Sequence, residues 1–66
     1  MSEPLSESRR RAVFAALVNA QDRGLPVARS RRFVGERFGI IEAEVLNIER
    51  EGLDNGWPPL HGPFSR

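Results

Sequence analysis

The side chains that could do chemistry in this chain are almost all arginines and carboxylates. All ten basic residues are arginine, the one histidine is His61, and cysteine and tyrosine are absent. Ser30 lies among arginines without a nearby histidine to activate it as a nucleophile. A calcium or magnesium site needs oxygen ligands converging from more than one element, whereas four glutamates fall on one predicted helix. We therefore expect no enzyme, cofactor, metal site or small-molecule substrate.

The charged residues are distributed unevenly along the chain. Residues 1–37 hold eight arginines against four acidic residues, a net charge of +4, and residues 38–66 hold two arginines against five acidic residues, a net charge of −3. A basic surface attracts phosphate groups and an acidic surface repels them. The first half of the chain is therefore the better candidate for contact with an anionic partner.

The length of 66 residues is enough for one small domain. A domain of this size buries only about 60% of the surface that its unfolded chain exposes, so its core is thin. No apolar run approaches the roughly 20 residues that a membrane span needs, and the acidic, polar start MSEPLSES is not typical of a secretory signal. We expect a cytoplasmic protein that does not bind membranes, which fits the absence of cysteine.

Apolar residues at helical spacing predict a first helix over about residues 7–22. Its apolar positions are Val13, Phe14, Leu17 and Val18. Ser6 or Ser8 can cap its N-terminus. The cluster Arg9-Arg10-Arg11 falls in the early turns, where the helix dipole is already positive and does not favour cations. The cluster is therefore either solvated charge or a site for an anion or an acidic partner.

Two further helices are predicted, one from Val27 or Ala28 to Phe38 and one over Ile41–Asp54. The apolar positions of the earlier one are Val27, Phe33, Val34 and Phe38. Gly35 lies inside it, where glycine costs about 1 kcal/mol relative to alanine, so close packing of another helix is expected there. The last helix has an inward stripe at i, i+4, i+7 and i+11, namely Ile41, Val45, Ile48 and Gly52.

The segment after the last helix, Trp57-Pro58-Pro59-Leu60, is expected to be extended, because proline cannot continue a helix. Trp57 and Leu60 are predicted to lie back over the helices and enlarge the core. A proline-rich ligand is the alternative interpretation of this segment. Residues 1–5 are expected to be a flexible arm, residues 6–60 the domain, and residues 61–66 a flexible tail.

The segment VGERFGI at residues 34–40, followed by Val45 and by IERE at residues 48–51, resembles the C-terminal helix-turn-helix of bacterial sigma factors. That region recognises the promoter −35 element. The similarity covers about residues 30–53 and lies in the framework positions, which are Gly35, Phe38, Gly39, Ile40, Val45 and Ile48. It implies an all-α, three-helix helix-turn-helix domain, here with an extended Trp-Pro-Pro C-terminal tail.

The positions that would contact DNA depart from the family pattern. Where the family usually has a Ser or Thr cap followed by arginines, this chain has Ile41, Glu42, Glu44 and Leu46. One glutamate on a recognition helix is compatible with readout, because carboxylates accept from cytosine N4. Four glutamates on the same helix work against the phosphate backbone.

The first functional hypothesis is a DNA-binding transcriptional regulator that contacts double-stranded DNA. The second helix would supply a basic surface from Arg29, Arg31, Arg32 and Arg37. The third would enter the major groove with Glu44, Asn47 and Arg50 toward base edges. Asparagine can pair with adenine and arginine with guanine.

The alternative hypothesis is a protein–protein interaction module on the same scaffold. The third helix would then bind a partner or a second copy in a homodimer through the acidic and apolar residues Ile41, Glu42, Leu46, Glu49 and Leu53. Exposed apolar strips with charged rims mark such surfaces. Ordinary core packing is an equal explanation for Leu46.

Overall fold

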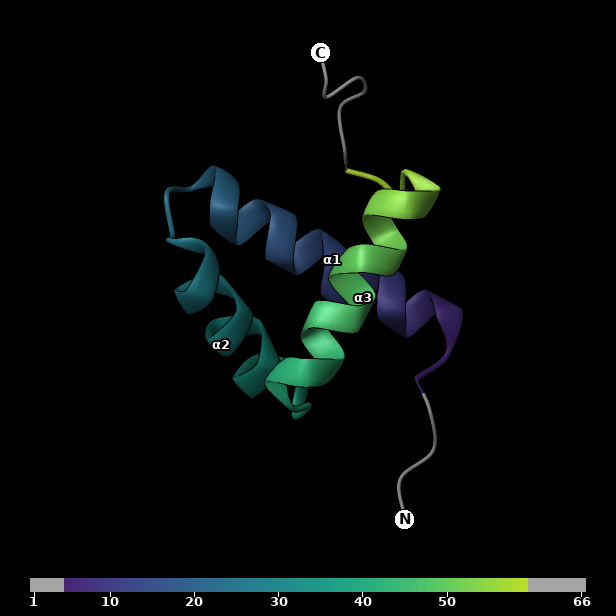
Figure 1. Cartoon of the computed structure of the whole chain (residues 1–66), viewed down its shortest axis with the longest axis horizontal. Coiled ribbons are helices and arrows are strands. Elements are labelled where there is room, and N and C mark those ends of the chain that lie inside the picture. Colours follow the sequence, from purple (N-terminus) through teal and green to yellow (C-terminus); the bar gives the residue numbers. More distant parts are fainter. Residues whose placement is uncertain (1–4, 60–66) are drawn as a thin grey trace.

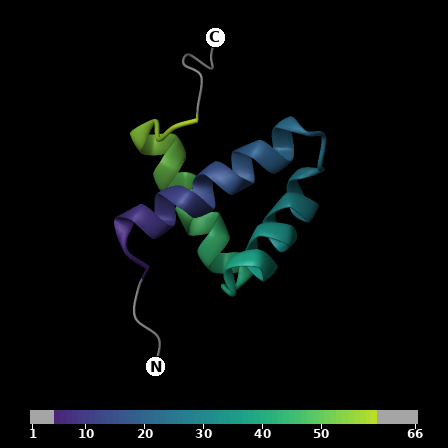
Figure 2. The same cartoon turned by 180° about the vertical axis from the view of Figure 1, so that it is seen from behind.

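The computed structural model describes residues 5–59, and this part of the chain is all helical with no strand. The helices are α1 (Glu7–Asp22), α2 (Val27–Phe38) and α3 (Glu42–Asn55). Each helix contacts the other two. Figures 1 and 2 show α3 crossing α1, with α2 beside both. The all-α prediction is confirmed over the described residues, and each predicted helix boundary lies within one residue of the observed one.

The core lies where the three helices meet. Its buried members come from all three helices and from the segment after α3: Val13, Phe14, Leu17, Val34, Val45, Ile48 and Trp57. The rings of Phe14 and Trp57 meet edge to face, with their centroids 6.1 Å apart, an arrangement that aromatic pairs favour. A thin core therefore gains a large aromatic side chain from outside the helices.

Helix α1 begins at a side-chain cap. The Oγ of Ser6 accepts a hydrogen bond from the backbone N–H of Arg9 at 3.2 Å, so Ser6 rather than Ser8 supplies the predicted cap. Glu7 lies in the first turn, where a carboxylate interacts favourably with the helix dipole. The cap and this charge together fix where the helix starts.

The connection between α2 and α3 is only three residues long, and Gly39 makes it possible. Gly39 adopts a left-handed conformation with φ 70°, which side chains with a Cβ rarely adopt. The backbone N–H of Ile40 then donates to the carbonyl of Gly35 at 2.9 Å. Helix α3 starts directly afterwards without a side-chain cap, so α2 and α3 meet at a tight corner.

Gly35 lies where α2 approaches this corner and α3 most closely. A Cβ built on Gly35 would lie 2.9 Å from the carbonyl oxygen of Ile40 and 3.6 Å from Cγ2 of Val45. The predicted close packing at Gly35 is therefore present, and it involves both the connection and α3.

Ile41 and Phe33 differ from their predicted placement in the core. Ile41 is 70% exposed, since it precedes α3 in an extended conformation and does not share the inward direction of Val45. Phe33 is 48% exposed. The prediction that Ile41 belongs to the inward stripe is wrong, whereas Val45, Ile48 and Gly52 are buried as expected.

The segment after α3 is only partly described. Trp57 is buried, and Pro58 and Pro59 lie in a turn. Leu60 and residues 61–66 lie outside the described residues, as do residues 1–4. The extended conformation predicted for residues 57–60 is therefore not confirmed. None of α1, α2 and α3 has the length and apolar character that would let it cross a membrane.

Candidate functional site

Helix α3 presents one line of residues to solvent. Ala43, Asn47, Arg50 and Asp54 recur at i, i+4, i+7 and i+11, and all four are exposed. The buried residues Val45, Ile48 and Gly52 lie on the opposite side of the helix. This spacing keeps residues on one face of a 3.6-residue helix, so the amide of Asn47 and the guanidinium of Arg50 point away from the core.

An ion pair with α1 restrains Glu51 of α3. The Nε of Arg10 donates to Oε1 of Glu51 at 2.8 Å, and Nη2 donates to Oε2 at 3.0 Å. Arg10 also donates from Nη1 to the carbonyl of Leu5 at 2.8 Å. The hydrogen bond and charge of Glu51 raise the pKa of Arg10, against partial desolvation. The two-fold contact fixes the direction of the Glu51 carboxylate.

A second ion pair joins α3 to α2 through Glu49. The Oε1 of Glu49 accepts from Nε of Arg31 at 3.0 Å and lies 2.9 Å from its Nη2. The exposed fractions of the two side chains are 15% for Glu49 and 32% for Arg31. The sequence predicts Arg31 on a DNA-binding surface and Glu49 in a protein interface, but the structure brings them together between the helices. The two charges therefore offset each other, and the carboxylate of Glu49 is mostly shielded from a partner.

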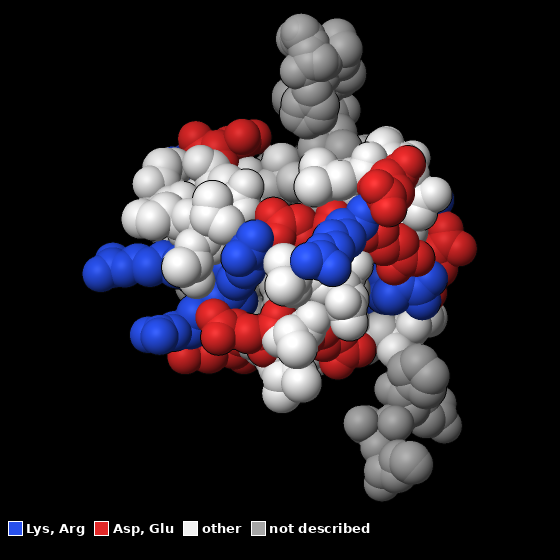
Figure 3. All heavy atoms as spheres, viewed as in Figure 1, with Lys and Arg blue, Asp and Glu red and all other residues white. Residues whose placement is uncertain are grey.

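The remaining residues predicted to bind DNA occupy different places. Arg29, Arg32 and Arg37 are exposed on α2, and none of them forms an ion pair within residues 5–59. Glu44 is half-buried and lies off the outward line of α3. Figure 3 shows basic side chains projecting beside α2, and basic and acidic side chains interspersed over α3. The exposed basic residues therefore lie mainly on α2 rather than on α3.

The residues predicted for a protein interface are only partly accessible. Ile41 and Leu53 are 70% and 53% exposed, and Glu42 is also exposed. Leu46 is half-buried, so it contributes to packing as well as to the surface. Glu49 is held by Arg31, so the accessible residues of the predicted interface are Glu42, Ile41, Leu53 and part of Leu46.

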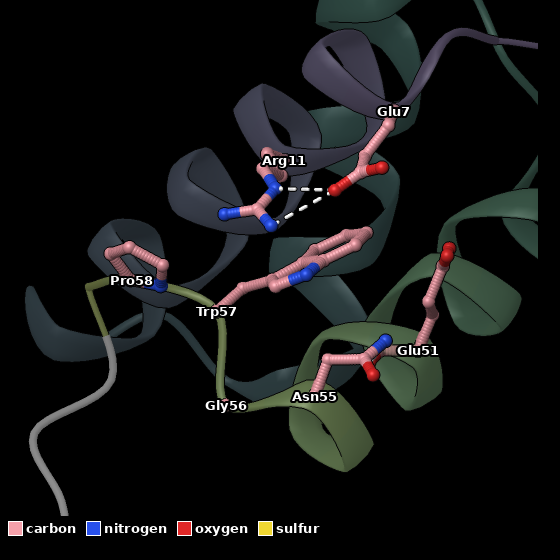
Figure 4. Close-up of a pocket in the computed structure, with 7 residues that line it drawn as sticks. All are labelled: Glu7, Arg11, Glu51, Asn55, Gly56, Trp57 and Pro58. Atoms are coloured by element: carbon pink, nitrogen blue, oxygen red, sulfur yellow. Dashed lines mark hydrogen bonds and ion pairs between the residues drawn. The ribbon is translucent and has the colours of Figure 1, made fainter.

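The cluster Arg9-Arg10-Arg11 is used within the molecule. Arg11 contacts Glu7 through an Nη2–Oε2 distance of 2.9 Å, and its guanidinium lies 5.0 Å from the centre of the Trp57 ring. Figure 4 shows the Arg11 guanidinium over the Trp57 ring. Both side chains line a polar hollow of about 400 Å³ between α1 and the end of α3. Arg9 lies over the Phe38 ring. The cluster therefore holds the ends of the helices together. The sequence predicts either solvated charge or a site for an anion or an acidic partner, and neither includes these contacts within the chain.

Ser30 has a structural role in the buried contact between α1 and α2. It is fully buried, donates from Oγ to the carbonyl of Val27 at 2.6 Å, and accepts from Nε2 of Gln21 at 3.1 Å. Within residues 5–59, no three acidic side chains gather as a metal site would require. His61 lies outside the described residues. The hydrogen bonds of Ser30 thus explain why a polar residue lies inside this core.

No family model matches the chain, and the searches found no similar curated protein or solved structure. The resemblance of residues 30–53 to the promoter-recognising region of sigma factors thus stays a prediction.

Proposed function

We propose that this protein is a small helix-turn-helix protein that binds double-stranded DNA and regulates transcription. In this proposal α2 and α3 form the helix-turn-helix, and α3 enters the major groove. The three-residue corner between them and the sigma-like sequence of residues 30–53 support it. A helix in the major groove reads base edges through its outward polar side chains, and Asn47 and Arg50 occupy that place on α3.

The placement of the glutamates of α3 carries the proposal. Arg31 and Arg10 hold Glu49 and Glu51 against the neighbouring helices, which turns two carboxylates aside from the line of Asn47 and Arg50. The other two, Glu42 and Glu44, lie in the first turn of α3, where the positive end of the helix dipole offsets part of their charge. The four glutamates of α3 therefore oppose DNA less than the sequence alone implies, and Asp54 is the acidic residue that stays on the outward line.

The basic residues beside this face would contact the phosphate backbone. Arg29 and Arg32 are exposed on α2, and Arg50 would reach either a base or a phosphate from α3. Each neutralised phosphate releases counterions, so affinity falls as salt rises. With two or three such contacts, raising salt from about 50 to about 200 mM should weaken binding roughly ten- to fortyfold.

The test is a salt titration of binding by fluorescence anisotropy, with a pool of labelled duplexes of mixed sequence. We expect saturable binding at low salt and the steep loss just described. Arg50→Gln should weaken binding by about tenfold, because a base contact is worth about 1–3 kcal/mol. Arg23→Gln removes the same charge from the end of α1 and is the matched control. Absence of binding at low salt, or equal effects of the two substitutions, would contradict the proposal.

A second candidate is a protein interface on the Leu46 and Leu53 flank of α3, and the 53% exposure of Leu53 favours it. If two copies or a partner pack there, Leu53→Glu should abolish the association, which analytical ultracentrifugation would detect. Val27→Glu is the matched control, because Val27 is 48% exposed and lies on α2. A chain that stays monomeric at millimolar concentration excludes the homodimer.

A further inference from the structure

A groove of about 620 Å³ lies between α1 and α2. Its floor is one face of α1, where four alanines and one asparagine line it: Ala12, Ala15, Ala16, Asn19 and Ala20. Phe33 and Phe38 of α2 form its wall, and Leu25 closes one end. Phe33 is 48% exposed because its side chain lines this groove and does not enter the core as predicted. A floor of mostly small apolar side chains beside a half-exposed aromatic ring is a surface that another apolar element can cover.

The groove lies on the side of the α1–α2 pair away from α3. Helix α3 contacts α1 through Phe14 and Arg10, and it contacts α2 through Arg31 and Gly35. None of these residues lines the groove. In Figure 2, which views the molecule from behind, α1 passes in front of α3. A ligand in the groove would therefore leave the outward line of α3 free.

Every charged residue of the groove is cationic. Arg23 and Arg37 lie among its lining residues, no acidic residue does, and the guanidinium of Arg9 covers the Phe38 ring at 5.6 Å. None of these three arginines forms an ion pair in the described part of the chain. Arg37, predicted from the sequence to contact DNA, thus faces a different surface. Charge complementarity requires an occupant with carboxylates beside its apolar side chains.

The dimensions of the groove match a short helix. The lining residues run from Ala12 of α1 to Arg23, which directly follows the end of α1, a length of about 16 Å or three helical turns. A helix of that length places apolar residues at i, i+3, i+4 and i+7 along one groove, and this is a recurrent mode of peptide recognition. Alanines in the floor let the backbone of such a helix approach closely.

We propose that the α1–α2 groove binds an acidic amphipathic helix of a partner protein. Its apolar side chains would pack on the alanine floor against Phe33, and its carboxylates would reach Arg23 and Arg37. A second copy of this chain is a poorer occupant, because α3 is its acidic helix and the apolar stripe of α3 is already buried in the core. The proposal is independent of DNA binding by α3.

Two synthetic helical peptides with identical leucine spacing test this proposal, one with glutamate and one with lysine at the remaining positions. Amide chemical shifts of the ¹⁵N-labelled protein report the binding site. We expect the glutamate peptide to shift residues 12–23 and 33–38 and to bind at least about tenfold more tightly than the lysine peptide. Phe33→Gln should weaken binding by about tenfold or more without lowering the melting temperature, because the ring is half-exposed.

Val27→Gln provides the matched control for Phe33→Gln. Both side chains are 48% exposed on α2, but Val27 does not line the groove, so its replacement should leave peptide affinity unchanged. Equal binding of the two peptides, shifts centred on α3, or no shifts at millimolar peptide would overturn the proposal. Shifts of the groove residues that depend on protein concentration without peptide would assign the groove to a second copy and also overturn it.

Discussion

At the scale of single residues, Gly52 sets the distance between α1 and α3. A Cβ built on Gly52 would collide with the ring of Phe14, which is fully buried at the centre of the core. The ring also carries the edge contact with Trp57. A side chain at position 52 would therefore displace two aromatic residues as well as the helix axis.

We predict that Gly52→Ala lowers the free energy of unfolding by about 1–2 kcal/mol. Overpacking a core costs about 1–3 kcal/mol, and the better helix propensity of alanine returns up to about 1 kcal/mol. Urea denaturation followed by circular dichroism measures the change. Repeating the substitution in a Phe14→Leu background is the control, where the loss should shrink. An equal loss in both backgrounds would mean that the Phe14 ring is not the cause.

At the scale of elements, two ion pairs tie α3 to its neighbours, whereas a third lies within α1. The Arg31–Glu49 pair joins α2 to α3 and is mostly shielded, with side chains 32% and 15% exposed, while the exposed fractions of Arg11 and Glu7 are 46% and 59%. Shielded pairs with restrained side chains lose less Coulomb energy to solvent. The interhelical pair should therefore contribute more to stability than the pair along α1.

Double-mutant cycles with glutamine substitutions measure this difference. For Arg31 and Glu49 we expect a coupling energy of up to about 1 kcal/mol, and for Arg11 and Glu7 about 0.3–0.5 kcal/mol. Both couplings should decrease in about 1 M salt, and the exposed pair should decrease by the larger fraction. A coupling between Arg31 and Glu49 no larger than that of the surface pair would show that the contact does not restrain α3.

The helices and the close packing at Gly35 could be predicted from the sequence, but the ion pairs between the helices could not. Apolar residues at helical spacing around Phe14, Val34 and Val45 predict three helices, and Gly39 indicates the turn between α2 and α3. The partners in Arg31–Glu49 and Arg10–Glu51 are 18 and 41 residues apart, and no spacing rule links such residues. For the same reason the sequence predicts Arg31 and Arg37 on one surface, although they lie about 120° apart around α2. The groove has no sequence signature beyond the alanines of α1.

At the scale of the whole molecule, the domain has two separate surfaces. The outward line of α3 carries Asn47 and Arg50. The groove with Phe33 lies on the side of the α1–α2 pair that faces away from α3. Because the two surfaces share no residue, a ligand on one need not exclude a ligand on the other. Taken together, the two proposals describe a protein that connects DNA to a second protein.

Trp57 is the only tryptophan of the chain, and it is 4% exposed between the Phe14 ring and the Arg11 guanidinium. Indole emission shifts to longer wavelength when the ring becomes hydrated. The protein therefore carries its own fluorophore, which reports on the packing of α1 against the end of α3 without a dye. Since the indole belongs neither to the outward line of α3 nor to the groove, its spectrum can separate loss of structure from loss of binding in variants of those two surfaces.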